Sequence, residues 1–372
     1  MFIEVHMIQS FAPANLNRDD TNAPKDCEFG GVRRARISSQ CIKRSVRMHP
    51  SFAQTTRTEP GVRTIWMKRI ITNALVENGK STEMAKTVSE AFVIHYCKMD
   101  KKNKEKTSVL LYISKQEIND IVSQLLSQWD DIARELAEGK SSVIDGIAKE
   151  LFKGLQGRTS APDIALFGRM VAEKPDLNID AACQVAHAIS THRVNMEMDF
   201  FTAADDMALE EETGAPMMGT TGYNSACFYR YARIDWDQLV ANLGSDRDLA
   251  RRTVEGFLRA IVAAVPTGKQ NSFAAQNPPS LLMVTVREDH QGWSLANAFE
   301  KPVLPDRNGG LIGPSIKAMD ENWERITAVY GDNGLKAFVL ALDGDEELRA
   351  LKKYRVDNLE DWITRAIQEL PA

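Results

Sequence analysis

A long stretch of helical periodicity, from about residue 65 to 153, separates an N-terminal strand pattern from several later ones, and it constrains the fold more than any other feature. Its apolar residues recur at the spacing of one helix face, most clearly at Ile118, Ile121, Val122, Leu125, Leu126, Trp129, Ile132 and Leu136. Residues 2–9 alternate instead, which predicts a half-buried strand with Glu4 and His6 on its outer face. A helical block between strand-bearing segments predicts an α+β fold with a helical insertion.

Two later segments predict a protruding β-hairpin. Residues 195–202 alternate between apolar and polar and then lead into an acidic segment that ends at Gly214. Residues 225–231 have the pattern of the returning strand.

Helices are predicted on both sides of this hairpin. Residues 181–191 favour a short helix, and the apolar residues from Val254 to Val265 share one face of a longer helix. A loop over 266–279 then leads to a strand over 281–287. We find no tandem repeat and no linker between independent domains.

Composition and spacing argue against several kinds of site. The five cysteines are scattered without a CxxC pair, so neither a disulfide framework nor a zinc site is indicated, and we expect a reducing cytoplasm. No run of about 18 apolar residues predicts a membrane span. Gly268 and Lys269 resemble part of a phosphate loop, but Ala263 and Gln270 stand where that motif requires Gly and Ser or Thr. We expect no cofactor and no ATPase activity.

The six histidines also lack a metal-binding spacing, so we expect no bound metal. His187 and His192 are five residues apart, which places them on opposite sides of the predicted helix over 181–191. We interpret His192 as structural rather than as a general base, because no Ser or Cys motif accompanies it.

The strongest chemical signal is a basic island within an acidic chain. Between residues 29 and 49 there are six Lys or Arg residues and no Asp or Glu. Removing these six charges from the formal net charge of −5 leaves −11 on the rest of the chain. Solubility alone does not require such segregation, so the island predicts a local anion site.

The island combines residue types that contact a nucleic-acid backbone. The glycine pair at 30–31 permits a close backbone approach, and Ser38 or Ser39 caps a predicted helix whose first amides can receive a phosphate. Lys43 and Arg47 follow at i,i+4 spacing, which is unfavourable unless an anion lies between them. Such contacts position a strand without reading its bases. The alternative is a solvated basic helix.

Ordered motifs run through nearly the whole chain, the exception being residues 70–150. They are His6–Ser10, Asn15–Asp20, Lys25–Asp26, Phe29–Gly31, Arg36–Gln40, Lys43–Arg44, Asp163–Leu166, Gly168–Met170, Ala186–Ile189, Thr191–His192, Asp199–Ala203, Asp205–Asp206, Phe228–Tyr231, Val265–Pro266, Lys269–Gln270, Asn277–Pro278 and Ala296–Glu300. Together they closely resemble the CasC (Cse4) family, the backbone subunit of the type I-E CRISPR Cascade complex.

The resemblance implies a hand-shaped protein. Residues 1–64 and 181–372 would form an RRM-like (ferredoxin-like) palm, and residues 65–180 an inserted helical finger domain. A β-hairpin over about 200–224 would be the thumb. Copies of such subunits stack along CRISPR RNA (crRNA), and each thumb bends the RNA.

The resemblance also implies which residues bind RNA. The set is Lys25, Ser38, Gln40, Lys43, Arg44, Arg47, Arg169, Met170, Phe200, Thr202, Lys269 and Gln270, with no catalytic or metal-binding residue. Met170 would wedge beside bases, and Phe200 and Thr202 would belong to the thumb. Arg47 stands where the family is expected to carry lysine, which keeps the charge and alters the contact geometry.

The implied partners are crRNA, target DNA paired to that guide, further copies of the chain, and Cascade subunits of the CasA, CasB, CasD and CasE types. No membrane partner is implied. Specificity in antiviral defence would come from base pairing with the guide, because backbone contacts leave the base edges free.

Two other functions stay open from the sequence. One is an RNA-cleaving backbone subunit like those of type III complexes, with Asp19 or Asp20 as the metal-binding residue. We favour instead the interpretation that these aspartates cap turns and pair with Arg18. The other is an RNA-binding protein that works without partners.

Overall fold

The computed structural model describes residues 1–203, 217–289 and 291–371. The chain divides into two compact units. The first contains residues 1–52, 184–234 and the chain from 257 onward, and the second contains residues 53–183 and 235–256. Strands and helices are both abundant, which confirms the mixed α and β character predicted from the sequence.

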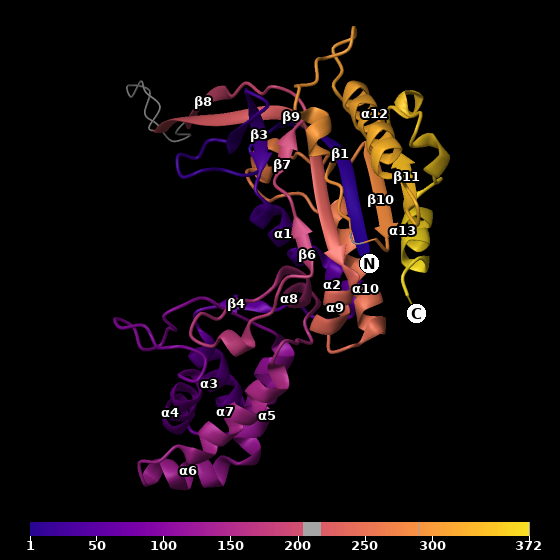
Figure 1. Cartoon of the computed structure of the whole chain (residues 1–372). Helices are drawn as coiled ribbons and strands as arrows, with labels where there is room; N and C mark the ends of the chain where they lie inside the picture. The colour runs from indigo at the N-terminus through magenta and orange to yellow at the C-terminus, as the bar shows by residue number, and fades with distance from the viewer. Residues whose placement is uncertain (204–216, 290, 372) are drawn as a thin grey trace, which may run out of the picture. The chain divides into compact units, whose positions relative to one another are not determined.

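One large sheet forms the frame of the first unit (Figure 1). Its main strands are β1 (Phe2–Ala14), β2 (Asp26–Phe29), β3 (Val32–Ile37), β7 (Ala188–Ser190), β9 (Met217–Asp235), β10 (Leu281–Arg287) and β11 (Lys336–Ala341). Neighbours follow the order β11, β10, β1, β9, β7, β3, β2. β1 is antiparallel to β10, and β10 is antiparallel to β11. The strand predicted over residues 281–287 is confirmed at both ends.

Helices cover the central strands. The helix α12 (Ile312–Tyr330) and the short helix η2 (Leu295–Phe299) pack apolar side chains against Ile8, Tyr229 and Met283 of the sheet. The C-terminal helix α13 (Leu359–Gln368) is tied to β11, because the indole Nε1 of Trp362 donates to the carbonyl of Phe338 at 3.1 Å. Among the described residues, no helix combines the length and the apolar character needed to cross a membrane.

The first strand is buried on both faces, so the prediction of a half-buried strand is wrong. Glu4 and His6 are as buried as the neighbouring apolar residues Ile3, Val5 and Met7. Their partners come from β9 and from the segment before η2: Tyr231 and the amide of Trp293 donate to Glu4, and Nδ1 of His6 lies 2.9 Å from the Tyr229 hydroxyl. Polar residues tolerate such burial when they are hydrogen-bonded.

The helix predicted over residues 181–191 is also wrong. Two short strands, β6 (Cys183–Val185) and β7, occupy this segment. Ile189 pairs with Tyr229 of β9 on one side and with Arg36 of β3 on the other. Ladder hydrogen bonds to two neighbouring strands outweigh the helix propensity of the alanines. His187 and His192 therefore do not lie on a helix.

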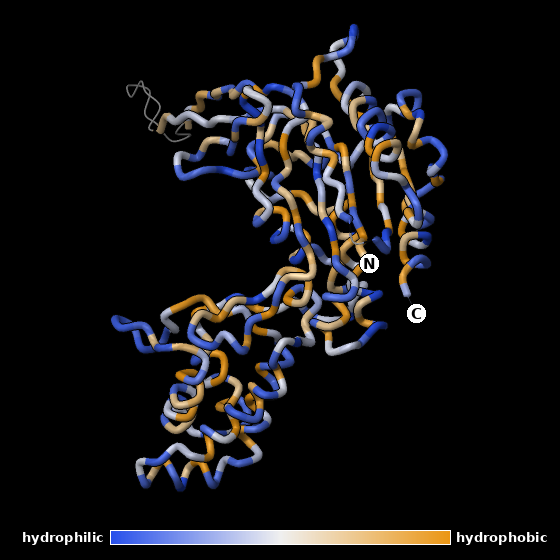
Figure 2. Tube along the Cα trace, viewed as in Figure 1, coloured by the Kyte–Doolittle hydropathy of each residue, from blue (hydrophilic) through white to orange (hydrophobic). Residues whose placement is uncertain are grey.

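Helices dominate the second unit, as the sequence predicted. They include α3 (Met67–Glu77), α4 (Thr82–Val93), α5 (Lys115–Ser127), α6 (Trp129–Ala137), α7 (Ser142–Leu155), α8 (Pro162–Phe167) and α9 (Trp236–Asn242). Hydrophobic and hydrophilic residues alternate along them, as expected for helices with one buried face (Figure 2). The periodicity over 118–136 is divided between α5 and α6, which separate at Gln128.

A buried arginine organises one side of the sheet. Arg34 of β3 donates to the carbonyls of Phe29, Ser190 and Phe299 at 3.1, 3.1 and 2.8 Å. Gly30 approaches the same region so closely that a Cβ on it would lie 1.7 Å from the carbonyl oxygen of Glu300. Gly30 therefore accommodates the protein's own backbone, which corrects the expectation that it admits a ligand.

The burial of His6 predicts a loss of stability in acid. Burial lowers the pKa of His6 to about 3. The unfolded chain takes up this proton near pH 6.5 and the folded chain does not, so stability falls as the pH drops from about 6.5 towards 3. The loss from this group is on the order of 4 kcal/mol. In His6→Asn, which retains a polar atom near Tyr229, the acid-side decline in the free energy of unfolding should be shallower.

Chemical denaturation from pH 7.5 to pH 4 checks this prediction. Burial raises the pKa of nearby Glu4, which opposes the effect of His6, but Glu4 is present in both proteins and cancels in the comparison. Parallel pH profiles for the two proteins would contradict the assignment.

Candidate nucleic-acid interface

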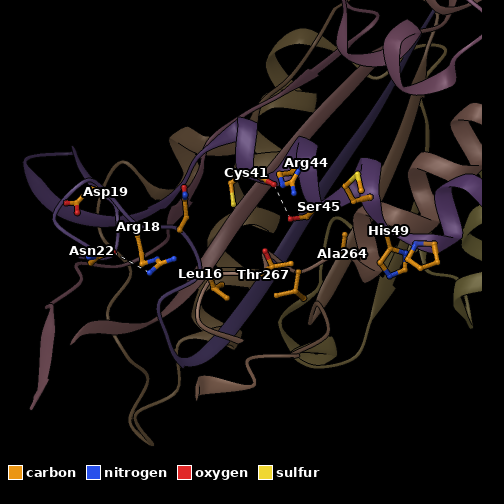
Figure 3. Close-up of a pocket in the computed structure, with 15 residues that line it drawn as sticks. Leu16, Arg18, Asp19, Asn22, Cys41, Arg44, Ser45, His49, Ala264 and Thr267 are labelled. Carbon is orange, nitrogen blue, oxygen red and sulfur yellow. Dashed lines mark hydrogen bonds between the residues drawn. The ribbon is translucent and has the colours of Figure 1, made fainter. Parts of the chain in front are cut away.

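A groove of about 540 Å³ opens in the first unit (Figure 3). Three segments line it: the loop after β1, the helix α1 (Ser39–Met48), and the loop that follows α10 (Arg247–Ala263). The lining residues are Leu16, Asn17, Arg18, Asp19, Asn22, Cys41, Arg44, Ser45, Met48, His49, Pro50, Ala264, Val265, Thr267 and Gly268. Two arginines and one aspartate among them give the lining a net positive charge.

Alternate polar residues hold the first wall of the groove in place. Nδ2 of Asn15 donates to the carbonyls of Asn22 and Gly222 at 3.0 and 2.8 Å. Oδ1 of Asn17 accepts from the amide of Ser38 at 2.8 Å. The motif over residues 15–20 therefore joins this loop to β9 and to the start of α1.

The carboxylate of Asp19 shapes the turn. It accepts from the amide and hydroxyl of Thr21 at 2.9 and 2.7 Å and from the amide of Ala23 at 3.0 Å. The hydrogen bond from the Thr21 side chain is the main cause that lowers the pKa of Asp19. The interpretation of Asp19 as a turn cap is confirmed, although Arg18 contacts Asn22 (3.3 Å) rather than Asp19. In the described part of the chain, no three His, Cys, Asp or Glu side chains form a metal-binding group.

The helix α1 starts as the sequence predicted, with Ser38 as its N-cap and its hydroxyl accepting from the amide of Cys41 at 3.3 Å. The chain itself uses more of this helix end than we expected. The amide of Ser39 donates to Nδ1 of His187 at 3.2 Å. Burial, with help from Arg36 and Lys25, lowers the pKa of His187, so its ring is neutral and accepting at pH 7. A phosphate would therefore meet few open amides here, which revises the prediction for Ser38 and Ser39.

The basic island is divided between structural and groove-facing cations. Arg33 pairs with the carboxylate of Asp26 at 2.7 Å, and Arg36 donates to the carbonyl of the same residue at 3.1 Å. Arg44 is exposed and lines the groove. The cations Arg34 and Arg36 thus support the sheet, whereas Arg44 faces a potential ligand.

The predicted exposed pair of Lys43 and Arg47 needs a correction. Lys43 is half-buried, and Arg47 is only 7% exposed, with its Nη2 at 3.5 Å from the sulfur of Met48. The burial of Arg47 follows from its position on the face of α1 that also buries Ile42 and Val46. Gln40 is exposed at the start of the same helix.

The surroundings of Cys41 show which charges lie close to the groove. The hydroxyl of Ser45 donates to the backbone carbonyl of Cys41 at 3.0 Å (Figure 3). Burial raises the pKa of Cys41, and the positive charges of Lys25 and Arg44 partly oppose that rise. Lys25, which is half-buried, and Arg44 therefore both lie within electrostatic reach of one point in the groove.

The loop that follows α10, called the late loop below, forms the wall opposite the loop after β1. A Cβ on Gly268 would lie 2.4 Å from the carbonyl oxygen of Leu16, so only glycine fits there. Lys269 follows with φ of 49°, and Gln270 closes the loop by donating to the carbonyl of Pro266 at 2.9 Å. Both residues are half-buried beside the groove. Gln270 therefore supports the loop, whatever else it contacts.

The predicted hairpin is confirmed. β8 (Glu197–Ala203) pairs with β9 from Glu197↔Tyr223 to Ala203↔Met217, and the two strands extend past the rest of the sheet (Figure 1). Phe200 is 62% exposed, and Thr202 is exposed on the same face. Most of the acidic segment predicted to end at Gly214 lies outside the described residues.

Arg169 and Met170 belong to the second unit. Nη1 of Arg169 contacts both carboxylate oxygens of Glu117 at 2.8 and 2.9 Å, and its Nε donates to the carbonyl of Leu177. This side chain is buried and has a structural role, which argues against the predicted contact of Arg169 with RNA. Met170 next to it is 81% exposed, and its role as a wedge beside bases stays a prediction.

The sequence did not point to Asn22, Ser45, Thr267 or Gly268 as parts of a single groove. These residues come from three segments that meet through the fold, and each is unremarkable in its local pattern. The signal that was available is the alternation of Asn15, Asn17 and Asp19, because regularly spaced polar residues in a loop often bond to backbone.

Comparison with known proteins identifies relatives of the whole chain. Residues 3–368 match the family described as CT1975-like protein. A solved chain of a "CRISPR RNA-guided surveillance complex, pre-nicking" superimposes with a TM-score of 0.86 at 31% identity, covering 98% of this chain and 100% of that chain. A chain of a "CRISPR RNA-guided surveillance complex" gives 0.78 at 26% identity, with 100% of each chain covered. No curated protein matches.

The contact at Gly268 gives a test of how the groove is built. Gly268→Ala should force the late loop away from Leu16 and lower the free energy of unfolding by about 1–3 kcal/mol. Gly313→Ala in α12 is the matched control, because a Cβ there would meet Glu347 at an ordinary 3.7 Å. Urea denaturation of the two variants checks the prediction. Equal stabilities would show that the close approach of the two loops is not needed.

Proposed function

This chain belongs to the CT1975-like family of Cascade backbone subunits, and we propose that it binds crRNA along the groove between the loop after β1, α1 and the late loop. The observation that carries the proposal is that three segments bearing the sequence motifs, residues 15–20, 36–44 and 265–270, all contribute side chains or backbone to one cationic groove. We assign the chain to the type I-E branch of Cascade on the same motifs.

In this proposal the RNA is held by its sugar-phosphate chain. Arg18, in the loop after β1, and Arg44, in α1, both line the groove and would each contact a phosphate. Lys25, which acts on the same point of the groove as Arg44, and Lys43, the neighbour of Arg44 in α1, would add to the binding. Backbone contacts leave the base edges free, so target DNA is selected by pairing with the guide. The acidic remainder of the chain limits non-specific binding of DNA.

The large sheet would serve as an RRM-like palm, the second unit as the finger domain, and the β8–β9 hairpin as the thumb. Exposed apolar side chains on the hairpin support this assignment: Met198, Phe200, Phe201, Met217 and Met218. Proteins that function as monomers seldom expose so many large apolar side chains on one element. We propose that the hairpin contacts RNA and neighbouring copies of the chain.

The remaining partners follow from the same premise. Several copies would stack along one crRNA together with subunits of the CasA, CasB, CasD and CasE types, and the complex would act against foreign DNA in the cytoplasm. A protein that binds RNA without partners would have no use for a hairpin with five exposed large apolar side chains.

The salt dependence of RNA binding tests the groove. Each phosphate contact to a single strand contributes about 0.7 to the slope of log affinity against log salt concentration. Arg18→Gln with Arg44→Gln should therefore lower the slope by roughly 1.4, for RNA of any sequence. Arg47→Ala is unsuitable for this purpose, because Arg47 is buried.

Arg33→Gln supplies the control for this measurement. Arg33 is exposed and basic, but it pairs with Asp26 outside the groove. Its slope should equal that of the wild type. A wild-type slope in the Arg18 and Arg44 double variant would place the RNA elsewhere.

Assembly along RNA tests the hairpin. Phe200→Ser with Met218→Ser changes two side chains that are 62% and 67% exposed, so folding should be preserved. RNA-length-dependent assemblies, measured by sedimentation, should be lost. Val329→Ser with Tyr330→Ser is the matched control, because these residues are 74% and 70% exposed at the end of α12. Unchanged assembly of the hairpin variant would rule out the thumb assignment.

We further propose that the chain has no nuclease activity. Asp19 already accepts three hydrogen bonds within its own turn, which leaves little capacity for a metal ion. Incubation with guide-complementary RNA and Mg²⁺ should leave that RNA intact. Cleavage that disappears in Asp20→Ala would instead support a backbone subunit of the RNA-cleaving type III kind.

A further inference from the structure

Asn15 lies where three parts of the first unit meet. Its side chain is fully buried, and its Nδ2 donates to the carbonyl of Asn22 within the groove wall and to the carbonyl of Gly222 in β9. Its own carbonyl oxygen would lie 2.7 Å from a Cβ on Gly268 of the late loop. One buried residue thus contacts both walls of the groove and the hairpin.

The base of the hairpin rests on the same two walls. Gly222 pairs with Met198 of β8, and a Cβ on Gly222 would lie 3.2 Å from Cδ of Pro24 at the end of the first wall. The ring of Tyr223 lies 5.8 Å from that of Phe273, in the short helix α11 (Gln270–Phe273) of the late loop. Displacement of either wall would therefore disturb the first residue pairs of the hairpin.

We infer that Asn15 is a positioning residue that couples occupancy of the groove to the order of the β8–β9 hairpin. The inference rests on the proposed function, since a strand bound in the groove is what fixes the two walls. The side-chain amide of Asn15 can donate to both carbonyls only while the loop after β1 and strand β9 keep their present separation. A buried carbonyl that loses its hydrogen-bond donor lowers the stability of that arrangement. Fixing the walls therefore favours one hairpin arrangement.

The coupling must act in both directions, because linkage between two binding events is reciprocal. A hairpin held by a neighbouring copy would favour RNA binding in the groove of its own copy. Subunits added next to one already on the RNA would then bind more tightly than isolated ones.

Hydrogen exchange of the full chain tests the inference. The probe is a uridine oligomer of about six nucleotides, within the range that one module covers. In the wild type, this RNA should slow exchange at the hairpin base, residues 197–203 and 217–223, by at least about fivefold. In Asn15→Ala the oligomer should still bind, with lower affinity, but protection of the hairpin base should fall below about twofold.

Ser225→Ala is the matched control. The hydroxyl of Ser225 also ties β9 to a backbone carbonyl, that of Phe11 at 2.8 Å, but it does not touch the groove wall. This variant should retain the wild-type protection. If Asn15→Ala fails to fold, Asn15→Ser replaces it, and the wild-type comparison is decisive in either case.

The outcomes separate this inference from the proposed function. RNA binding without protection of the wild-type hairpin base would overturn the coupling and leave the proposed function standing. Equal protection in the wild type and Asn15→Ala would also overturn the coupling, because it would mean that protection of the hairpin base does not depend on Asn15. Failure of the wild type to bind RNA at all would remove the proposed function, and the coupling with it.

Discussion

The groove depends on a guanidinium that is buried in the sheet. Arg34 has no solvent exposure, and its hydrogen bonds go to backbone carbonyls of Phe29, Ser190, Phe299 and Glu300. Bonds from a charged donor are about twice as strong as neutral ones, and a buried charge that lost them would be severely destabilising. Arg34 thereby locks the β2–β3 hairpin to β7 and η2. Because β3 ends at Ile37 and Ser38 caps α1, the same lock sets where α1 begins.

The helix α1 forms one side of the groove, and two loops with almost no secondary structure, the loop after β1 and the late loop, form the rest. Side-chain amides of Asn15 and Asn17 fasten the first loop to β9 and to α1. Gly268 allows the second loop to lie directly against the first. The cations that face the groove are therefore carried on walls held by backbone contacts, an arrangement that suits recognition of a strand by shape and charge rather than by sequence.

Much of the fold could be predicted because it follows from local patterns. The strand over 281–287, the cap at Ser38, the hairpin of β8 and β9 and the helices of the second unit all agree with periodicity or capping rules. The failures have a common cause. Residues 181–191 form strands and Glu4 is buried because of partners on β9 and β3 that lie far away in the sequence.

The sequence predicted the region of the site, but not which of its cations face the groove. The basic island led to Arg44, which lines the groove, but sequence cannot distinguish an arginine that faces a groove from one that is buried, as Arg34 and Arg47 show. Arg169 illustrates the same difficulty, since its partner Glu117 is 52 residues away. Charge composition therefore indicated the region, and only packing separates its structural cations from those available to a ligand.

The most direct test of the account is whether RNA covers Cys41. Cys41 is half-buried and lines the groove, whereas Cys27 is equally half-buried in β2 and is not part of the lining; Cys97, Cys183 and Cys227 are buried. Burial raises the pKa of both half-buried thiols, so alkylation should be carried out at about pH 9, where both can still react. The modified cysteines should then be mapped by peptide analysis with and without saturating single-stranded RNA. The account predicts that RNA slows modification of Cys41 by at least about tenfold and leaves Cys27 unchanged. Equal rates at Cys41 with and without bound RNA would contradict it.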